Sequence, residues 1–73
     1  MDTLEFRLRG EYVALCDLLK LTGIAGSGGQ GKLMIANGEV SVDGKPESRK
    51  TAKIRAGQTV CCFGQTVRVV AGA

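Results

Sequence analysis

Histidine is absent from this 73-residue chain, and its carboxylates are scattered rather than paired at apolar positions. Histidine is the side chain that most often serves as a general acid or base near neutral pH. Without it, the sequence offers no catalytic constellation. A chain this short also leaves little room for a deep substrate cleft. We therefore expect a non-catalytic protein that needs no cofactor, takes no small-molecule substrate, and folds as a single domain over residues 1–73.

Cysteine is scarce and odd in number, with only Cys16, Cys61 and Cys62 present. None of them belongs to a C-x-x-C pair, and no histidine could complete a ligand set, so the sequence predicts no metal site. Cys61 and Cys62 lie in an apolar run, where adjacent residues of a strand point to opposite faces. We predict reduced cysteines that act as small hydrophobic residues, with redox sensing as the alternative.

Long apolar runs are missing as well. No stretch approaches the roughly 20 residues of a membrane span. Residues 1–10, MDTLEFRLRG, lack the basic start and the apolar stretch of a signal peptide. We expect a cytoplasmic protein that does not associate with a membrane.

Aromatic residues are few: Phe6, Tyr12 and Phe63, each among apolar neighbours. We predict that all three lie in the core. A bound nucleic acid would then be held by its phosphates and its shape, because no exposed ring would be available to stack on a base.

Negative charge is scarce in the second part of the chain. Residues 1–44 carry four Lys or Arg and six Asp or Glu, whereas residues 45–73 carry six Lys or Arg and a single acid, Glu47. The formal net charge is only +3. The asymmetry therefore indicates an anionic partner better than the total does. A solvated polar face is the alternative interpretation of such a cluster.

The periodicity of apolar residues predicts several short elements. Alternation at 4–8 indicates a strand, and helical spacing at 11–21 indicates an amphipathic helix. Alternation at 39–42, 59–63 and 66–70 indicates three more strands. The expected hairpin turns are Asp43-Gly44 and Gly64-Gln65. Pro46 should confine the strand after the first turn to a sheet edge, and Lys53 and Arg55 should share a face opposite Ile54.

A second helix is predicted after Ser27, because Gln30 follows at capping-box spacing. Packing of Leu33, Met34 and Ile35 should stabilise it, since glycines weaken its first turn. Asn37 and Gly38 should end the helix through a left-handed conformation.

The stretch Gly26 to Lys32 matches the G-x-x-x-x-G-K part of a nucleotide-binding loop. Leu33 stands where that motif needs a hydroxyl to hold magnesium, and the preceding segment is predicted as a helix rather than a strand. Nucleotide hydrolysis is therefore disfavoured. A glycine-rich helix start still presents free N–H groups to a phosphate.

The order of these parts resembles the RNA-binding domain named after the fourth protein of the small ribosomal subunit, the S4 domain. The resemblance runs from Leu15 to Val60 and is greatest to small stand-alone bacterial proteins of this type. It rests on Cys16-Asp17-Leu18-Leu19-Lys20, Ser27-Gly28-x-Gln30-x-Lys32, Gly38-x-Val40-x-Val42-Asp43-Gly44, Glu47-x-Arg49-Lys50, Lys53-Ile54 and Gly57-Gln58-Thr59-Val60.

The resemblance implies an α+β fold of the αL RNA-binding motif type, with two short helices packed on a small, bent, mostly antiparallel sheet. It also implies an RNA-binding surface. The candidate contacts are Ser27, Gly28, Gln30 and Lys32 at the helix start and Lys45, Arg49, Lys50, Lys53 and Arg55 beyond the hairpin, with Lys20 as a weaker candidate.

One departure concerns the helix start. Many S4 domains carry an Arg just after the Ser and an Ala-Arg further along, where this chain has Gly28 and Gly31-Lys32. This predicts either weaker RNA affinity or a larger share carried by the cations at 45–55.

We therefore expect a monomer that binds structured RNA, ribosomal or transfer RNA, mainly through phosphate contacts. The alternative is an interaction adaptor whose basic face docks on an acidic or ribosomal protein partner. An enzyme acting on a phosphate-bearing substrate comes third.

Overall fold

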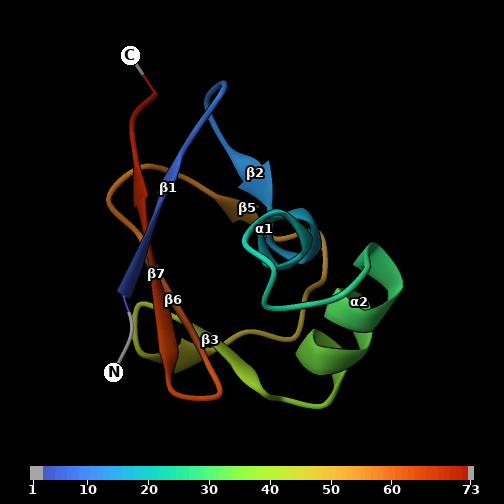
Figure 1. The fold of residues 1–73 in the computed structure, drawn as a ribbon. Helices are drawn as coiled ribbons and strands as arrows, with labels where there is room; N and C mark the ends of the chain where they lie inside the picture. Colours follow the sequence, from blue (N-terminus) through green and yellow to red (C-terminus); the bar gives the residue numbers. More distant parts are fainter. Residues whose placement is uncertain (1–2, 73) are drawn as a thin grey trace.

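The computed structural model describes residues 3–72, which form two short helices and two β-sheets (Figure 1). The larger sheet has the strand order β1-β7-β6-β3-β4, and the smaller one pairs β2 with β5. The strands are β1 Thr3–Arg7, β2 Val13–Ala14, β3 Val40–Val42, β4 Lys45–Pro46, β5 Lys53–Ile54, β6 Thr59–Cys62 and β7 Gln65–Val70. The helices are α1 Leu15–Leu21 and α2 Gly28–Ala36. Within the described residues, no helix is long and apolar enough to cross a membrane.

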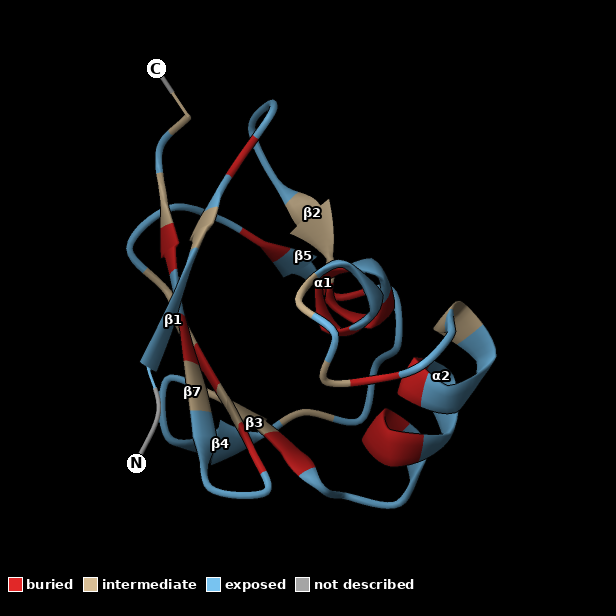
Figure 2. Ribbon diagram, in the orientation of Figure 1, coloured by how far each residue is buried: buried red, intermediate tan, exposed pale blue. Residues whose placement is uncertain are grey.

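The five-stranded sheet buries one face against the helices (Figure 2). On β6 and β7 the buried residues alternate along each strand, as a one-sided sheet requires; they are Val60, Cys62, Val67 and Val69. β1 pairs with β7 in parallel, and all other strand pairs are antiparallel. The predicted fold class, α+β with two short helices on a mostly antiparallel sheet, is confirmed.

The first helix is shorter than predicted. α1 begins at Leu15, and Val13 and Ala14 instead form β2, paired with Ile54 and Lys53 of β5. The loop before β5 also satisfies the start of α1, because Leu15 N–H donates to Ala52 O at 2.9 Å and Cys16 N–H to Lys50 O at 3.0 Å. The predicted helix is therefore present and ends at Leu21, but its predicted start at residue 11 was wrong because tertiary pairing overrides the local apolar spacing.

The second helix begins as predicted. Ser27 Oγ accepts from Gln30 N–H at 3.1 Å, while the Gln30 side chain reaches back one residue further than a capping box does and accepts from Gly26 N–H at 2.8 Å. Gly38, at φ 76°, ends the helix. Met34 and Ile35 are buried, but Leu33 is 64% exposed, so the prediction that Leu33 packs in the core was wrong.

The two helices cross closely at Gly31 of α2. A Cβ at this position would lie 3.1 Å from the carbonyl oxygen of Cys16 and 3.6 Å from Leu19 Cβ, both on α1. Glycine weakens a helix on its own. Its absence of a side chain here lets the backbones of α1 and α2 approach each other.

Both hairpin turns use positive φ at two successive residues, as tight turns of this kind require. The Asp43-Gly44 turn is confirmed, with φ 52° and 83°. The second turn falls at Phe63-Gly64 rather than Gly64-Gln65, because Cys62 pairs directly with Gln65. Pro46 lies on the edge strand β4, as predicted.

The aromatic residues are not all in the core. Phe6 is partly buried against it, but Phe63 is 67% exposed and Tyr12 is 46% exposed. The prediction of three core aromatic residues was therefore wrong for two of them. Phe63 is held outside by the turn it occupies, and Tyr12 by the short strand that follows it.

Phe63 combines exposure with a φ of 51°, a left-handed conformation that asparagine adopts far more readily than phenylalanine. Phe63→Asn should therefore raise the free energy of unfolding by about 1 kcal/mol, measured by urea denaturation with an unchanged m value. A destabilised variant would mean that packing of the ring outweighs the strain of its backbone.

Candidate functional site

Residues 45–55, here called the basic segment, run from the edge of the large sheet to the start of α1 and then along β5. Lys53 and Arg55 are exposed and flank the buried Ile54, as the alternation predicted. Lys50 is also exposed, and its carbonyl oxygen accepts the hydrogen bond from Cys16. The structure therefore places Lys50, Lys53 and Arg55 along the segment that supports the start of α1.

The glycine-rich start of α2 is connected to this segment through α1. Gly31 lies against the carbonyl oxygen of Cys16, and the N–H of the same residue bonds to Lys50. Ser27, Gln30 and Lys32 are exposed around this helix start. The backbone of Cys16 thus contacts both the start of α2 and the middle of the basic segment.

The other candidate cations are placed differently. Lys45 lies on the edge strand β4, next to the Asp43-Gly44 turn, and Lys20 lies in the last turn of α1. Both are exposed. Lys20 therefore belongs to the end of α1 opposite to the one that contacts the basic segment.

Tyr12 lies beside two of the candidate cations, which the local sequence pattern did not indicate. The Nζ of Lys53 lies 5.0 Å, and the guanidinium carbon of Arg55 5.7 Å, from the centre of its ring. Both distances suit cation–π contacts, which hold the two cations beside an exposed ring. The pairing of β2 with β5 brings Tyr12 close to Lys53 and Arg55. Because this pairing joins residues about 40 positions apart, no local sequence pattern reveals the contact.

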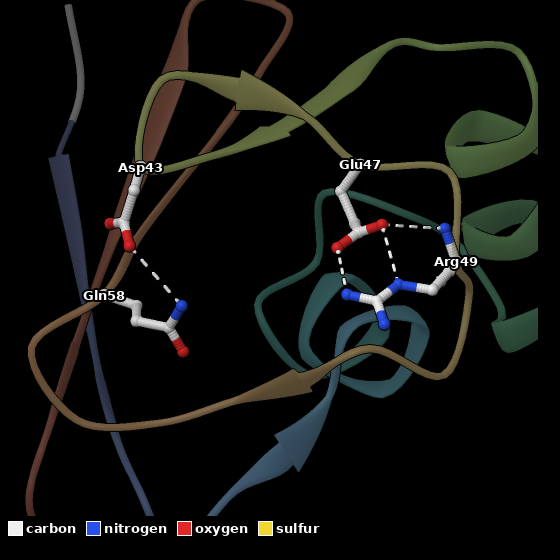
Figure 3. A network of polar contacts seen from close by, with 4 residues as sticks. All are labelled: Asp43, Glu47, Arg49 and Gln58. Carbon is white, nitrogen blue, oxygen red and sulfur yellow. Dashed lines mark hydrogen bonds and ion pairs between the residues drawn. The ribbon is translucent and has the colours of Figure 1, made fainter.

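Arg49 differs from its neighbours because an acid faces it (Figure 3). Its Nη2 lies 3.1 Å from Glu47 Oε1, and its Nε donates to Oε2 at 3.2 Å, while the Arg49 backbone N–H donates to Oε2 at 3.1 Å. This is the two-pronged geometry that suits a guanidinium and a carboxylate. The hydrogen bonds from the Arg49 side chain and backbone lower the pKa of Glu47.

The lowered pKa of Glu47 determines how this ion pair changes the stability of the fold with pH. The carboxylate of Glu47 contributes to stability above its unfolded pKa, and this contribution is lost as the pH falls through its lower folded pKa. At neutral pH the charge of Arg49 is therefore largely matched within the loop.

A second polar network connects the Asp43-Gly44 turn to the backbone of Arg55. Asp43 Oδ1 accepts from Thr59 N–H at 2.9 Å, and Oδ2 accepts from Gln58 Nε2 at 3.4 Å (Figure 3). The Oε1 of Gln58 in turn accepts from Arg55 N–H at 2.7 Å. The first hairpin turn and the end of β5 are thus connected through one glutamine.

The apparent nucleotide loop lies mostly inside a helix. Gly28 to Lys32 are the first residues of α2, and the helix α1, not a strand, comes before them. The structural context of the phosphate-binding loop is therefore missing, as predicted.

The cysteines are unpaired thiols, and Cys61 and Cys62 occupy opposite faces of β6 as predicted. Burial, and then the charge of Glu39, raise the pKa of the Cys62 thiol, which lowers its reactivity. Across residues 3–72 no three His, Cys, Asp or Glu side chains gather as a metal ligand set would.

The structure is that of a small α+β protein, with two short helices against a mostly antiparallel sheet and a basic segment beside the first helix. This chain belongs to the S4 domain family, which matches residues 6–70. The resemblance inferred from the short motifs is thereby confirmed.

The chain is 58% identical over 60 residues to the "Putative RNA-binding protein YbcJ" of Escherichia coli (strain K12), covering 82% of this chain and 86% of the relative. The "Uncharacterized protein YbcJ" of Shigella flexneri matches equally, at 58% over 60 residues.

Two solved structures share the fold. The solution structure of YbcJ from E. coli, described as having an αL motif involved in RNA binding, matches with a TM-score of 0.75 at 51% identity, over 97% of this chain and 91% of that one. The 30S ribosomal protein S4e of Thermoplasma acidophilum matches with a TM-score of 0.60 at 24% identity, over 80% of this chain and 31% of that one. The second likeness concerns the fold alone.

Proposed function

We propose that this chain binds structured RNA, ribosomal or transfer RNA, through the basic segment and the start of α2. The observation that carries the proposal is the row of exposed cations Lys50, Lys53 and Arg55 beside the start of α1. The name of the E. coli relative and the description of its solution structure support RNA as the partner.

Phosphate contacts suit these side chains better than base reading does. Lysine ammonium groups and exposed guanidinium groups pair with phosphate oxygens, and each neutralised phosphate releases condensed counterions. The N–H groups at the glycine-rich start of α2 add a further site for a phosphate, with Ser27, Gly28, Gln30 and Lys32 as its contacts. Lys45 extends the surface along the edge of the sheet.

We extend the proposal to the state in which the protein acts. The protein acts without catalysis, as a single-domain monomer in the cytoplasm. Its partner is an RNA whose fold presents phosphates at the spacing of the basic surface, rather than a particular base sequence.

Binding to a structured RNA, followed across a range of salt concentrations, tests the proposal. Three exposed cations and a helix start predict a linear plot of log affinity against log salt with a slope of roughly −2 to −4. A slope near zero, or no binding to hairpin or transfer RNA at low salt, would contradict it. Recovery of a protein partner from nuclease-treated lysate, without RNA binding, would favour the interaction adaptor instead.

Arg49 and Lys50 should behave differently in this assay, although they are neighbours. Lys50→Ala should flatten the salt slope by about 0.7–0.9, the contribution of one phosphate. Arg49→Ala should flatten it by clearly less, because Glu47 already matches the Arg49 charge. Equal effects would show that Arg49 leaves Glu47 when RNA binds.

A further inference from the structure

An open groove of about 1130 Å³ lies next to the basic segment, between β1, β2 and the end of α1. Its apolar wall includes Phe6, Tyr12, Val13 and Leu21, and two cations, Arg7 and Arg9, belong to its lining. Tyr12 is 46% and Leu21 60% exposed, so both side chains offer apolar surface to a molecule in the groove.

Tyr12 connects this groove to the basic segment. Its ring lines the groove, and the Nζ of Lys53 and the guanidinium carbon of Arg55 lie 5.0 and 5.7 Å from the centre of that ring. A molecule bound along Lys53 and Arg55 would therefore meet the groove at Tyr12. The groove is continuous with the proposed RNA-binding surface.

The charge of the groove selects an anionic occupant. Arg7 and Arg9 are exposed, and the single acid in the lining, Glu5, lies 4.0 Å from Arg68 of β7. A ligand that satisfies both the apolar wall and the two arginines needs a flat apolar part and a negative group a few ångströms away. A nucleotide has both parts.

We propose that this groove binds an unpaired nucleotide that extends from the structured RNA, with its base against Tyr12 and Leu21 and its phosphate on Arg7 or Arg9. This rests on the proposed function and adds a preference for RNA with a single-stranded extension. Stacking on an exposed aromatic ring tolerates any base, so the preference concerns the presence of the extension rather than its sequence.

The test compares two hairpin RNAs with the same stem, one blunt and one with a three-nucleotide single-stranded tail. Wild-type protein should bind the tailed hairpin about tenfold more tightly, the effect of one base stacked on an aromatic ring. Tyr12→Leu should reduce this preference to less than twofold. Phe63→Leu removes another exposed aromatic ring, one that lies outside the groove, and is the matched control, which should keep the full preference.

Leu21→Ser gives an independent check, because Leu21 is exposed and its loss should leave the fold intact. It should reduce the preference for the tail by a few fold while the blunt hairpin is bound as before. Equal binding of both hairpins by wild-type protein, or an unchanged preference in Tyr12→Leu, would overturn the inference. Failure of the proposed function itself would appear differently, as absent binding of the blunt hairpin at low salt.

Discussion

Replacing Arg49, Lys50, Lys53 and Arg55 together with alanine should weaken binding to structured RNA on the order of a hundredfold at low salt. Each of the three exposed contacts made by Lys50, Lys53 and Arg55 should contribute about 1 kcal/mol to the binding free energy. Arg49 should contribute little, because Glu47 already matches its charge. The salt slope should fall by roughly 2–3 units. Filter binding or fluorescence anisotropy across a series of salt concentrations measures both quantities.

This variant should remain folded, because the four side chains are exposed and the core below them is untouched. Arg68→Ala is a suitable control, since it removes an exposed cation from β7, on the five-stranded sheet, and should change RNA affinity little. Wild-type affinity in the quadruple variant would mean that the basic segment is a solvated face and that the RNA, if bound, contacts another surface.

Gly31→Val should destabilise the protein by about 2–3 kcal/mol, the upper part of the about 1–3 kcal/mol that overpacking usually costs. The added Cβ would lie 3.1 Å from the carbonyl oxygen of Cys16, and two further methyl groups would press on α1 near Leu19. Because these groups belong to backbone and to a buried side chain, α2 would have to move away from α1. Thermal or urea denaturation measures the loss.

Gly31→Ala is the matched comparison for this position. Its single methyl group meets the same carbonyl oxygen, but alanine also favours the helix over glycine by up to about 1 kcal/mol. The two effects oppose each other, so stability should stay within about 1 kcal/mol of the wild type. If valine were tolerated as well as alanine, the close crossing of the helices would not depend on glycine.

The Gly31→Val variant should also bind RNA more weakly than its loss of stability alone explains. Gly31 and Lys50 both contact the backbone of Cys16, so a displaced α2 changes the position of the helix start relative to the basic segment. Binding measured well below the unfolding temperature separates this effect from unfolding.

The features that the sequence predicted correctly depend on short-range chemistry. The Ser27 cap, the end of α2 at Gly38 and the Asp43-Gly44 turn each involve residues within four positions of one another. The burial pattern on β6 and β7 follows from alternation, which the chain also carries locally. These are the signals that one chain can reveal without knowledge of its neighbours in space.

Several of the features that the sequence did not predict depend on contacts between distant residues. Tyr12 looked like part of a helix because of its spacing, yet β5 draws Val13 and Ala14 into a strand and leaves the ring exposed beside Lys53. The partnership of Glu47 with Arg49 is local, but a count of charges treats both as independent. The cations of the basic segment were therefore predicted from the sequence, while the position of Tyr12 beside Lys53 and Arg55 and the pairing of Arg49 with Glu47 required the structure.

Ultraviolet cross-linking in living cells, followed by sequencing of the attached RNA and mass spectrometry of the attached peptides, tests whether this protein binds structured RNA through the start of α2 and the basic segment. We expect structured RNA attached to peptides from residues 27–32 or 45–55, with Tyr12 as a further attachment site. RNA recovery no greater than from an untagged control, or attachment confined to the exposed face of the five-stranded sheet, would contradict it.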